Sequence, residues 1–382
     1  MLREIIVWLQ GIPNMIMEKA KKYWRIKRQL FLIDIILNML VLYAVLFSRA
    51  TIILRNMAMG LTDNPFAYIA LYLLWLGVFI YIATFGLEYY EGFVLEHKFA
   101  LSSQPFLRWF KRHLKRGIIG GIISLIIAEA VYFLLRRYPQ NWWALAGIGW
   151  ILFTIILSRL APVLIIPVFY KYSPLNNEEL KKRLIRLAET TGAHVKGVFR
   201  INMSKETKKA NAALVGMGKT RRIIIGDTLL DNFNNDEIEV VLAHELGHHK
   251  KLHLWKLLAF GTVITFIGLF SADVIMKKYL RYFGFNDISD IGAFPLLCLL
   301  VLGFSLLAMP LQNGFSRYLE RRADMFALKT TWKPDAFIST MTKLAKQNLS
   351  DTTPNRLIEI LMYNHPPVSR RIQMAEDFKA NA

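Results

Sequence analysis

The sequence predicts a predominantly α-helical membrane protein, with about six transmembrane helices and a polar domain that contains a small β-sheet. The chain has 382 residues, of which 54% are hydrophobic, and its mean hydropathy is positive at +0.33. The apolar residues are gathered in long runs, and a helix of about 20 apolar residues crosses the ~30 Å hydrocarbon core of a bilayer. A soluble domain is the alternative, but its core helices rarely stay apolar on all sides over such a length.

The apolar runs divide the chain into segments. The predicted spans are residues 30–47, 66–85, 117–135, 143–169, 254–274 and 294–311. We therefore predict a basic N-terminal segment (1–29), a four-helix transmembrane region (30–169), a polar domain (170–252), a transmembrane hairpin (253–313) and a C-terminal part (314–382). Residues 1–20 are too interrupted to span, and could form an amphipathic helix in the membrane interface. No removable signal peptide is expected before the first span.

The basic residues are distributed unevenly between the loops. The net charge of +20 would suggest a nucleic-acid partner in a soluble chain, but we expect no nucleic acid here because Lys and Arg follow the membrane topology. Residues 1–29 and 98–116 are dense in basic residues, whereas the loops at 49–55 and 136–137 are sparse. By the positive-inside rule, both termini and the polar domain face the cytoplasm, in a bacterial inner membrane or an endoplasmic reticulum membrane.

A metal-binding motif lies just before the fifth span. Residues 244–248, HELGH, match H-E-x-x-H. On a helix, His244 and His248 lie one turn apart on the same face, so both can bind one Zn²⁺. Glu245 would then lie near an open coordination position, where it can accept a proton from water. One of three asparagines is expected to cap this helix: Asn232, Asn234 or Asn235.

A catalytic zinc site needs a third protein ligand, and the candidate is Glu320 in SRYLERRADMFALK. Asp324 follows one turn later and could orient a ligand histidine through its second ring nitrogen. Taken alone, this segment also fits an exposed, salt-bridged helix that carries three arginines: Arg317, Arg321 and Arg322. The topology favours the metal site. About 70 residues separate His248 from Glu320, but two spans lie between them, so a helical hairpin would return Glu320 to the level of His248.

The remaining histidines and the cysteine are given simpler roles. His249 is turned by about 100° from His248 on the helix, so it cannot easily join the same metal. We expect structural or solvated roles for His249 and His253. Cys298, the single cysteine, lies within a predicted span. The chain therefore forms no internal disulfide, and a cysteine-based zinc site is excluded.

Several motifs together resemble one known family. HELGH, then SRYLERRAD after two spans, then NHPPVSRRI resemble the integral-membrane zinc peptidases of the CAAX prenyl protease type 1 family, and the related bacterial membrane heat-shock metalloproteases. RLAPVLIIPVFYKYSPL (159–175) and KKANAALVGMGKTRRIIIGDTLL (208–230) are similar to further parts of that family, and EHKFALSSQPFLRWFKRHLK (96–115) is a looser match. The resemblance covers roughly residues 96–372.

The resemblance implies a gluzincin-type catalytic domain facing the cytoplasm and one Zn²⁺ per chain. It assigns His244, His248 and Glu320 as zinc ligands and Glu245 as the general base. It further implies these roles: Asp324 as the acid behind a ligand, His365 near the transition-state oxyanion, Asn211 and Ala212 on the substrate backbone, and Arg371 close by in substrate binding. The family's eukaryotic enzymes have seven spans, whereas this chain has six predicted spans, and it carries basic Lys111 and Arg112 where relatives often have an acid.

The residues themselves are consistent with these roles. Residues 213–216 and 222–225 are extended runs around a Met217-Gly218-Lys219 turn, which predicts a hairpin. Its exposed edge could bind a peptide by strand addition. His365 could stabilise negative charge on the scissile carbonyl, although by position alone it also fits a loop residue before a Pro-Pro turn.

The expected function is therefore that of a multi-pass integral-membrane zinc endopeptidase in a lipid bilayer. Its substrates would be peptides or proteins, either prenylated CAAX-type proteins or misfolded membrane proteins removed in quality control. Three other hypotheses explain the motifs less well: a scaffold with a structural zinc would not need Glu245, a transporter would not need H-E-x-x-H, and an intramembrane-cleaving protease would take its third ligand from within a span.

Overall fold

The computed structural model describes residues 14–216 and 221–381. The long helices are α2 (Asn14–Phe47), α4 (Pro65–Tyr89), α6 (Phe106–Arg137), α7 (Trp142–Leu160), α12 (His253–Tyr279) and α13 (Phe294–Thr331). The shorter helices are α3 (Ala50–Leu61), α5 (Glu96–Lys98), α8 (Ile166–Phe169), α9 (Glu178–Thr190), α10 (Asp227–Leu230), α11 (Asn235–Lys250), α14 (Pro334–Gln347), α15 (Arg356–Met362) and α16 (Val368–Ala380). The strands are β1 (Tyr172–Pro174), β2 (Val198–Ile201), β3 (Ala212–Val215) and β4 (Arg222–Gly226).

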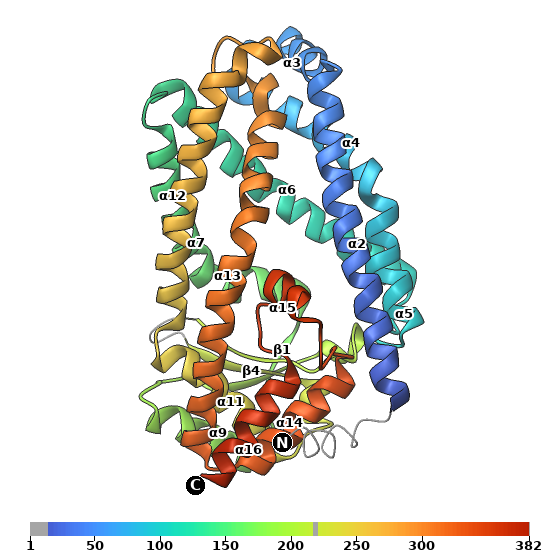
Figure 1. Ribbon diagram of the computed structural model, residues 1–382, viewed down its shortest axis with the longest axis vertical. Helices are drawn as coiled ribbons and strands as arrows, with labels where there is room; N and C mark the ends of the chain where they lie inside the picture. Colours follow the sequence, from blue (N-terminus) through green and yellow to red (C-terminus); the bar gives the residue numbers. More distant parts are fainter. Residues whose placement is uncertain (1–13, 217–220, 382) are drawn as a thin grey trace.

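Six helical segments of the described chain are long and apolar enough to cross a membrane, which confirms the predicted number of spans. They are Asn14–Phe47, Pro65–Lys98, Phe106–Arg137, Trp142–Phe169, His253–Phe283 and Ile291–Thr331. Short π-helical stretches, Tyr90–Leu95 and Ala161–Ile165, continue the second and fourth of them. The short apolar helix α3, which the sequence did not predict, joins the first two spans at the far end of the molecule (Figure 1).

Two predicted segment boundaries fall inside single helices. Residues 14–29, expected to form a separate N-terminal segment, are continuous with α2, and residues 1–13 of the expected interfacial helix lie outside the described residues. The boundary at 313/314 lies within α13, which runs without a break for 38 residues. The physical reason is that backbone hydrogen bonds within a helix do not require apolar side chains. An apolar run therefore marks the lipid-facing part of a helix and not its ends.

The polar domain is built on a four-stranded mixed sheet in the order β1-β2-β4-β3. β2 and β4 are parallel, whereas β1 and β3 run antiparallel to their neighbours. β3 and β4 pair from Ala212 opposite Ile225 to Val215 opposite Arg222, as the predicted hairpin requires. The predicted turn at 217–219 lies outside the described residues. β3 is an edge strand of the described sheet, so its outer backbone groups have no partner strand there.

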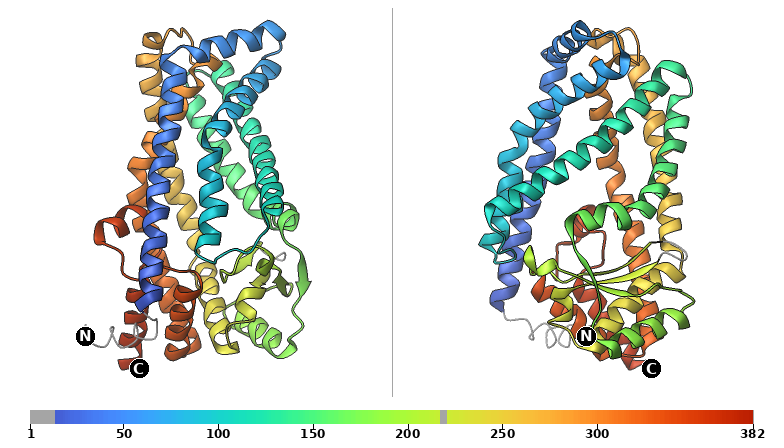
Figure 2. Two further views of the ribbon diagram at one scale, coloured as in Figure 1. Left: turned by 90° about the vertical axis from the view of Figure 1, so that its right-hand side faces the viewer. Right: turned by 180° about the vertical axis from the view of Figure 1, so that it is seen from behind.

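The sheet and the helices that cover it are gathered at one end of the molecule. Figure 1 shows α9, α11, α14 and α16 around the sheet, below the long membrane helices, and a buried apolar core joins these helices to the strands. The two views of Figure 2 show the long helices rising from this end. α13 is about 57 Å long at 1.5 Å per residue and passes from the far end of the membrane region into the polar domain. It therefore carries its last turns beside α11.

Candidate metal centre

The helix that carries H-E-x-x-H begins at a capping box. The Asn234 side chain accepts a hydrogen bond from the Glu237 backbone N–H at 2.9 Å, and the Glu237 carboxylate accepts one from the Asn234 N–H at 2.8 Å. Asn234 is thus the cap among the three asparagines that the sequence offered. Glu237 is buried, and it also accepts hydrogen bonds from Ser339 and Lys343 of α14. The start of α11 is in this way fixed to a neighbouring helix.

We expect Glu237→Gln to lower the free energy of unfolding by about 1–3 kcal/mol at neutral pH. Burial raises the pKa of Glu237, but the hydrogen bonds from Lys343, Ser339 and Asn234 outweigh it, and the net pKa is lowered. A carboxyl group with a depressed folded pKa stabilises the protein above its unfolded pKa of about 4.3, and this stability is lost as the pH falls through the folded pKa. The difference in the free energy of unfolding between wild type and variant should therefore disappear as the pH is lowered.

This gap can be measured by chemical unfolding in detergent at neutral and acidic pH, with chelator present throughout so that no metal contributes. Glu189→Gln, on the exposed face of α9, is the control and should show no comparable gap. A gap for Glu237→Gln that stays constant from neutral to acidic pH would contradict this electrostatic explanation.

α11 and α13 approach each other closely at a glycine. A Cβ atom added to Gly247 would lie 3.2 Å from the backbone of Ala323 and 3.1 Å from the Phe326 ring. Any larger residue at this position would push the two helices apart, because 3.2 Å is tighter than ordinary carbon contact. Gly247 thus allows α13 to pack closely enough against α11 for its side chains to reach the histidines.

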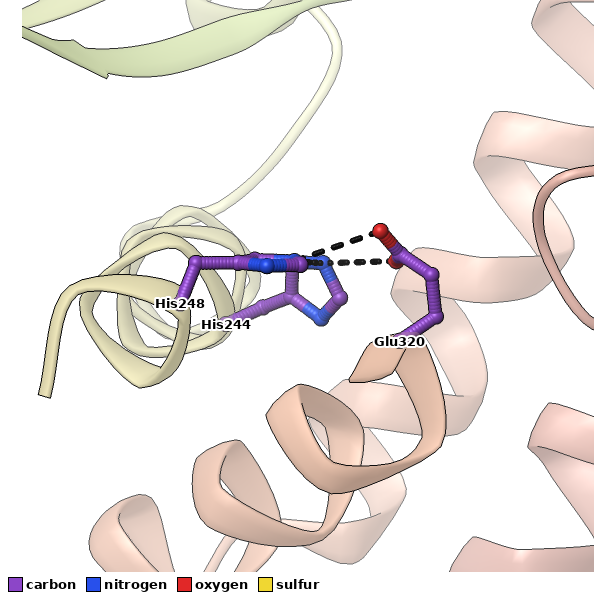
Figure 3. A group of neighbouring side chains, drawn as sticks. All are labelled: His244, His248 and Glu320. Carbon is purple, nitrogen blue, oxygen red and sulfur yellow. Dashed lines mark hydrogen bonds and ion pairs between the residues drawn. The ribbon is translucent and has the colours of Figure 1, made fainter. Parts of the chain in front are cut away.

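Three side chains from these two helices converge on one point (Figure 3). His244 Nε2 lies 3.1 Å from His248 Nε2 and 3.3 Å from Glu320 Oε2, and His248 Nε2 lies 3.3 Å from Glu320 Oε1. Donor atoms bound at about 2.0–2.1 Å and at tetrahedral angles to one ion are about 3.3 Å apart. Glu320 is buried, and its Oε2 atom has no hydrogen-bond partner among the described residues. Two imidazoles and a carboxylate at this spacing fit a divalent metal such as zinc.

The candidate ligand His244 pairs through its other ring nitrogen with a buried carboxylate. Its Nδ1 atom lies 2.8 Å from Asp324 Oδ1, and Asp324 is completely buried. Burial alone would lower the pKa of His244, but the Asp324 and Glu320 carboxylates raise it to about 10. The contact with Asp324 places a proton on Nδ1 of His244, so Nε2, which faces His248 and Glu320, is the atom that could bind a metal after losing its own proton. The structure places Asp324 where the sequence expected an orienting acid.

Arg371 contacts this acid directly. We expected Arg371 among the substrate-binding residues, but its guanidinium donates hydrogen bonds to both oxygens of Asp324, with a distance of 2.8 Å from Nε to Oδ2. The bidentate geometry fits a planar guanidinium on a carboxylate. Arg371, Asp324 and His244 therefore form a chain of contacts that ends at the metal centre.

Glu245 follows His244 on α11, within the same group of charged side chains. Burial raises the pKa of Glu245, with the nearby histidines His244 and His248 acting in the opposite direction. A carboxylate with a raised pKa is a stronger base than one in water. This environment therefore favours proton uptake by Glu245.

His365 reaches the centre from a loop between α15 and α16. Its Nε2 atom lies 3.3 Å from Glu320 Oε1, its Nδ1 atom lies 2.8 Å from Asn364 Oδ1, and 52% of its side chain is exposed. The loop is held by Arg317, which donates to the carbonyl oxygens of Glu359 at 2.8 Å and of Tyr363. Arg317 had been interpreted only as part of a possible salt-bridged surface. Its partners are carbonyl oxygens within α15 and directly after its end, which a sequence pattern cannot reveal.

The two predicted substrate residues lie at the open side of the sheet. Ala212 begins the edge strand β3, and the carbonyl of the exposed Asn211 accepts a hydrogen bond from Gly226 N–H at 2.9 Å. β3 packs against α11. β3 therefore lies beside the helix that carries His244 and Glu245.

The structure separates the two remaining histidines. His249 is partly exposed, and burial together with the charges of Arg221 and Lys250 lowers its pKa. His253 is completely buried, and its Nδ1 atom lies 3.1 Å from Nδ1 of His248. Of the two roles expected for His253, structural or solvated, its burial fits the structural one. Among the described residues it is the side chain that contacts the second ring nitrogen of this ligand histidine.

Comparison with known proteins agrees with this geometry. Residues 174–379 match the model of peptidase family M48, and residues 10–171 match the CAAX prenyl protease N-terminal domain, described as five membrane helices. In that second region the structure has four long spans and the short apolar helix α3.

Related sequences cover most of the chain. The uncharacterized metalloprotease YhfN of Bacillus subtilis is 28% identical over 94% of this chain and 84% of its own length. CAAX prenyl protease 1 of Saccharomyces cerevisiae is 29% identical over 75% of this chain and 67% of its own length. The crystal structure of S. mikatae Ste24p superposes with a TM-score of 0.85 at 24% identity, and covers 96% of this chain and 90% of that one. The chain belongs to peptidase family M48, and it is a multi-pass membrane metalloprotease with the fold of Ste24p.

Proposed function

We propose that this protein is a zinc-dependent endopeptidase that cleaves peptide segments of membrane-associated proteins, with prenylated CAAX-type proteins as the substrate class. One observation carries the proposal: His244, His248 and Glu320 converge with their donor atoms 3.1–3.3 Å apart, next to Glu245 on a helix that packs against the edge strand β3. The donor set is that of a catalytic zinc site, because three protein ligands leave a coordination position open.

When bound, zinc supplies a Lewis acid that polarises the scissile carbonyl and acidifies water. The chain supplies the rest. Glu245 accepts the proton of the attacking water and later donates it to the leaving amine. β3, beginning at Ala212, hydrogen-bonds the substrate backbone as an added strand and thereby fixes its register. His365, whose Nε2 atom lies 3.3 Å from Glu320 Oε1, stabilises the negative charge that develops on the carbonyl oxygen.

An apolar cavity supports a lipid-modified substrate. A cavity of about 460 Å³ lies among α6, α7, α12 and α13, and its wall includes Trp150, Phe153 and Phe304. Gln312, which also lines it, lies about two helical turns before Glu320 on α13. An isoprenoid chain is a hydrocarbon, so its transfer into such a cavity from water is favourable. The relatives named CAAX prenyl proteases support the same substrate class.

The charge distribution supports a cytoplasmic site. The basic first turns of α2 lie at the same end of the molecule as the sheet and α11 (Figure 1). Lys and Arg near the ends of spans favour the cytoplasmic side. We therefore place the metal centre on that side of the membrane.

The test is cleavage by detergent-purified protein after removal of metal with chelator and after restoration with zinc. Three substrates are compared: a CAAX-type peptide with a farnesyl group, the same peptide without it, and an unfolded membrane-protein fragment. The proposal expects no cleavage without metal, recovery with zinc, and a kcat/KM at least about tenfold higher for the farnesylated peptide, since one 15-carbon chain carries ample apolar surface. Equal rates on the two peptides with faster cleavage of the fragment would support quality control instead. Undiminished cleavage in chelator would refute the metal mechanism.

A further inference from the structure

The two ligand histidines of α11 are supported by different elements. His244 is held through Nδ1 by Asp324, whereas Nδ1 of His248 faces Nδ1 of His253 at 3.1 Å. The imidazole planes of His248 and His253 are nearly perpendicular, at 82°, with centroids 5.0 Å apart. This arrangement directs the ring nitrogen of His253 at the edge of the His248 ring. We propose that His253 is a positioning residue that fixes the ring orientation and tautomer of the metal ligand His248.

The proposal rests on the metal-ligand role of His248 given above, and the proton positions follow from it. Nε2 of His248 faces His244 Nε2 and Glu320 Oε1, so it is the nitrogen that binds metal. A neutral imidazole bound through Nε2 carries its proton on Nδ1. Nδ1 of His248 therefore donates, Nδ1 of His253 accepts, and the proton of His253 lies on its own Nε2, a buried atom with no hydrogen-bond partner among the described residues. A ligand histidine whose second nitrogen is hydrogen-bonded keeps its ring orientation and donates more strongly to the metal.

The backbone between the two histidines contains one left-handed residue that allows this contact. Leu252 joins α11 to α12 with φ 55°, in the left-handed region. A non-glycine residue there costs about 1–2 kcal/mol, and such conformations persist where the surrounding structure enforces them. This single left-handed residue ends α11 and turns the chain so that His253, the first residue of α12, is buried against His248.

The contact between His253 and His248 is a second connection, besides Glu320 on α13, between the membrane helices and the metal centre. α12 is a membrane-spanning helix, and α13 is the span that returns and carries Glu320. α13 thus provides one ligand, Glu320, and the first residue of α12, His253, orients another, His248. A displacement of α12 relative to α11 would then act directly on the His248 ring.

The experiment measures zinc affinity by competition with a chromophoric chelator, in detergent and without substrate. His253→Leu removes the acceptor and is expected to weaken zinc binding about 10–100-fold. His253→Asn places an amide oxygen near the position of Nδ1 and should remain within about threefold of wild type. His249→Leu is the matched control. It replaces a partly exposed histidine at the C-terminal end of α11 and should bind zinc like wild type.

A second readout separates positioning from simple packing. The rise in Tm on zinc saturation should shrink in His253→Leu and be retained in His253→Asn, whereas a packing role would lower the Tm of the metal-free protein and leave the rise unchanged. Equal zinc affinity of His253→Leu and His249→Leu would overturn the proposal. If His253→Leu does not fold, His253→Asn is compared with His253→Gln, whose amide lies one bond further out, and equal affinities of these two would overturn it. Absence of zinc binding in the wild type would instead refute the metal site itself.

Discussion

Replacing Glu245 with glutamine should reduce kcat by about 10²–10⁴-fold, the usual contribution of a general base, and leave bound metal near the wild-type level. Glutamine keeps the size and one oxygen of the side chain but cannot accept the proton of water near neutral pH. Glu245 is not among the three converging ligands, so its replacement leaves the donor set intact. The substitution should therefore lower the activity without lowering the metal content.

The measurement is steady-state cleavage together with metal analysis of the same preparation. Glu239→Gln is the control, because Glu239 lies on α11 but pairs with Arg183 and Lys333, away from the ligands. Its activity should stay within about threefold of wild type, since such partly exposed ion pairs contribute little. Full activity of Glu245→Gln would remove Glu245 from the mechanism, and loss of metal would make it a ligand.

Part of the metal centre could be predicted because its two histidines are four residues apart, which is close to one turn of an α-helix. His244 and His248 are one turn apart, so the sequence alone places both on one face of α11. Glu320 required a topological argument, namely that two spans return the chain to the same side. The structure agrees, because α13 continues past the apolar run that the sequence delimits.

Other contacts could not be predicted because they depend on how whole helices are placed. Arg317 contacts carbonyl oxygens of α15, and backbone acceptors have no signal in a sequence. His253 contacts His248 only because Leu252 adopts a left-handed conformation, which is rare for leucine. The extent of α2 and α13 was underestimated for a related reason: hydropathy indicates where lipid begins, whereas helix ends depend on caps and turns.

Substitution of Asp324 by asparagine should have the largest effect on stability. Asp324 is completely buried and is shared by His244 and Arg371. Asparagine preserves the volume but leaves the largely buried Arg371 guanidinium without its direct counter-charge, and breaking such a buried pair costs about 3–5 kcal/mol. The loss should appear in chemical unfolding of metal-free protein. Zinc affinity should also fall about 10–100-fold, because the His244 ring loses its charged partner.

The double variant Asp324→Asn/Arg371→Gln distinguishes this explanation from a packing defect. If an unpaired charge causes the loss, removal of both charges should cost clearly less than the sum of the single substitutions. Asp335→Asn, which breaks the exposed ion pair with Lys379, is the reference and should cost less than about 1 kcal/mol. Additive losses in the double variant would show that Asp324 stabilises the fold by its shape, and that Arg371 acts elsewhere. Zinc affinity should stay weak in the double variant, because His244 lacks its carboxylate in both.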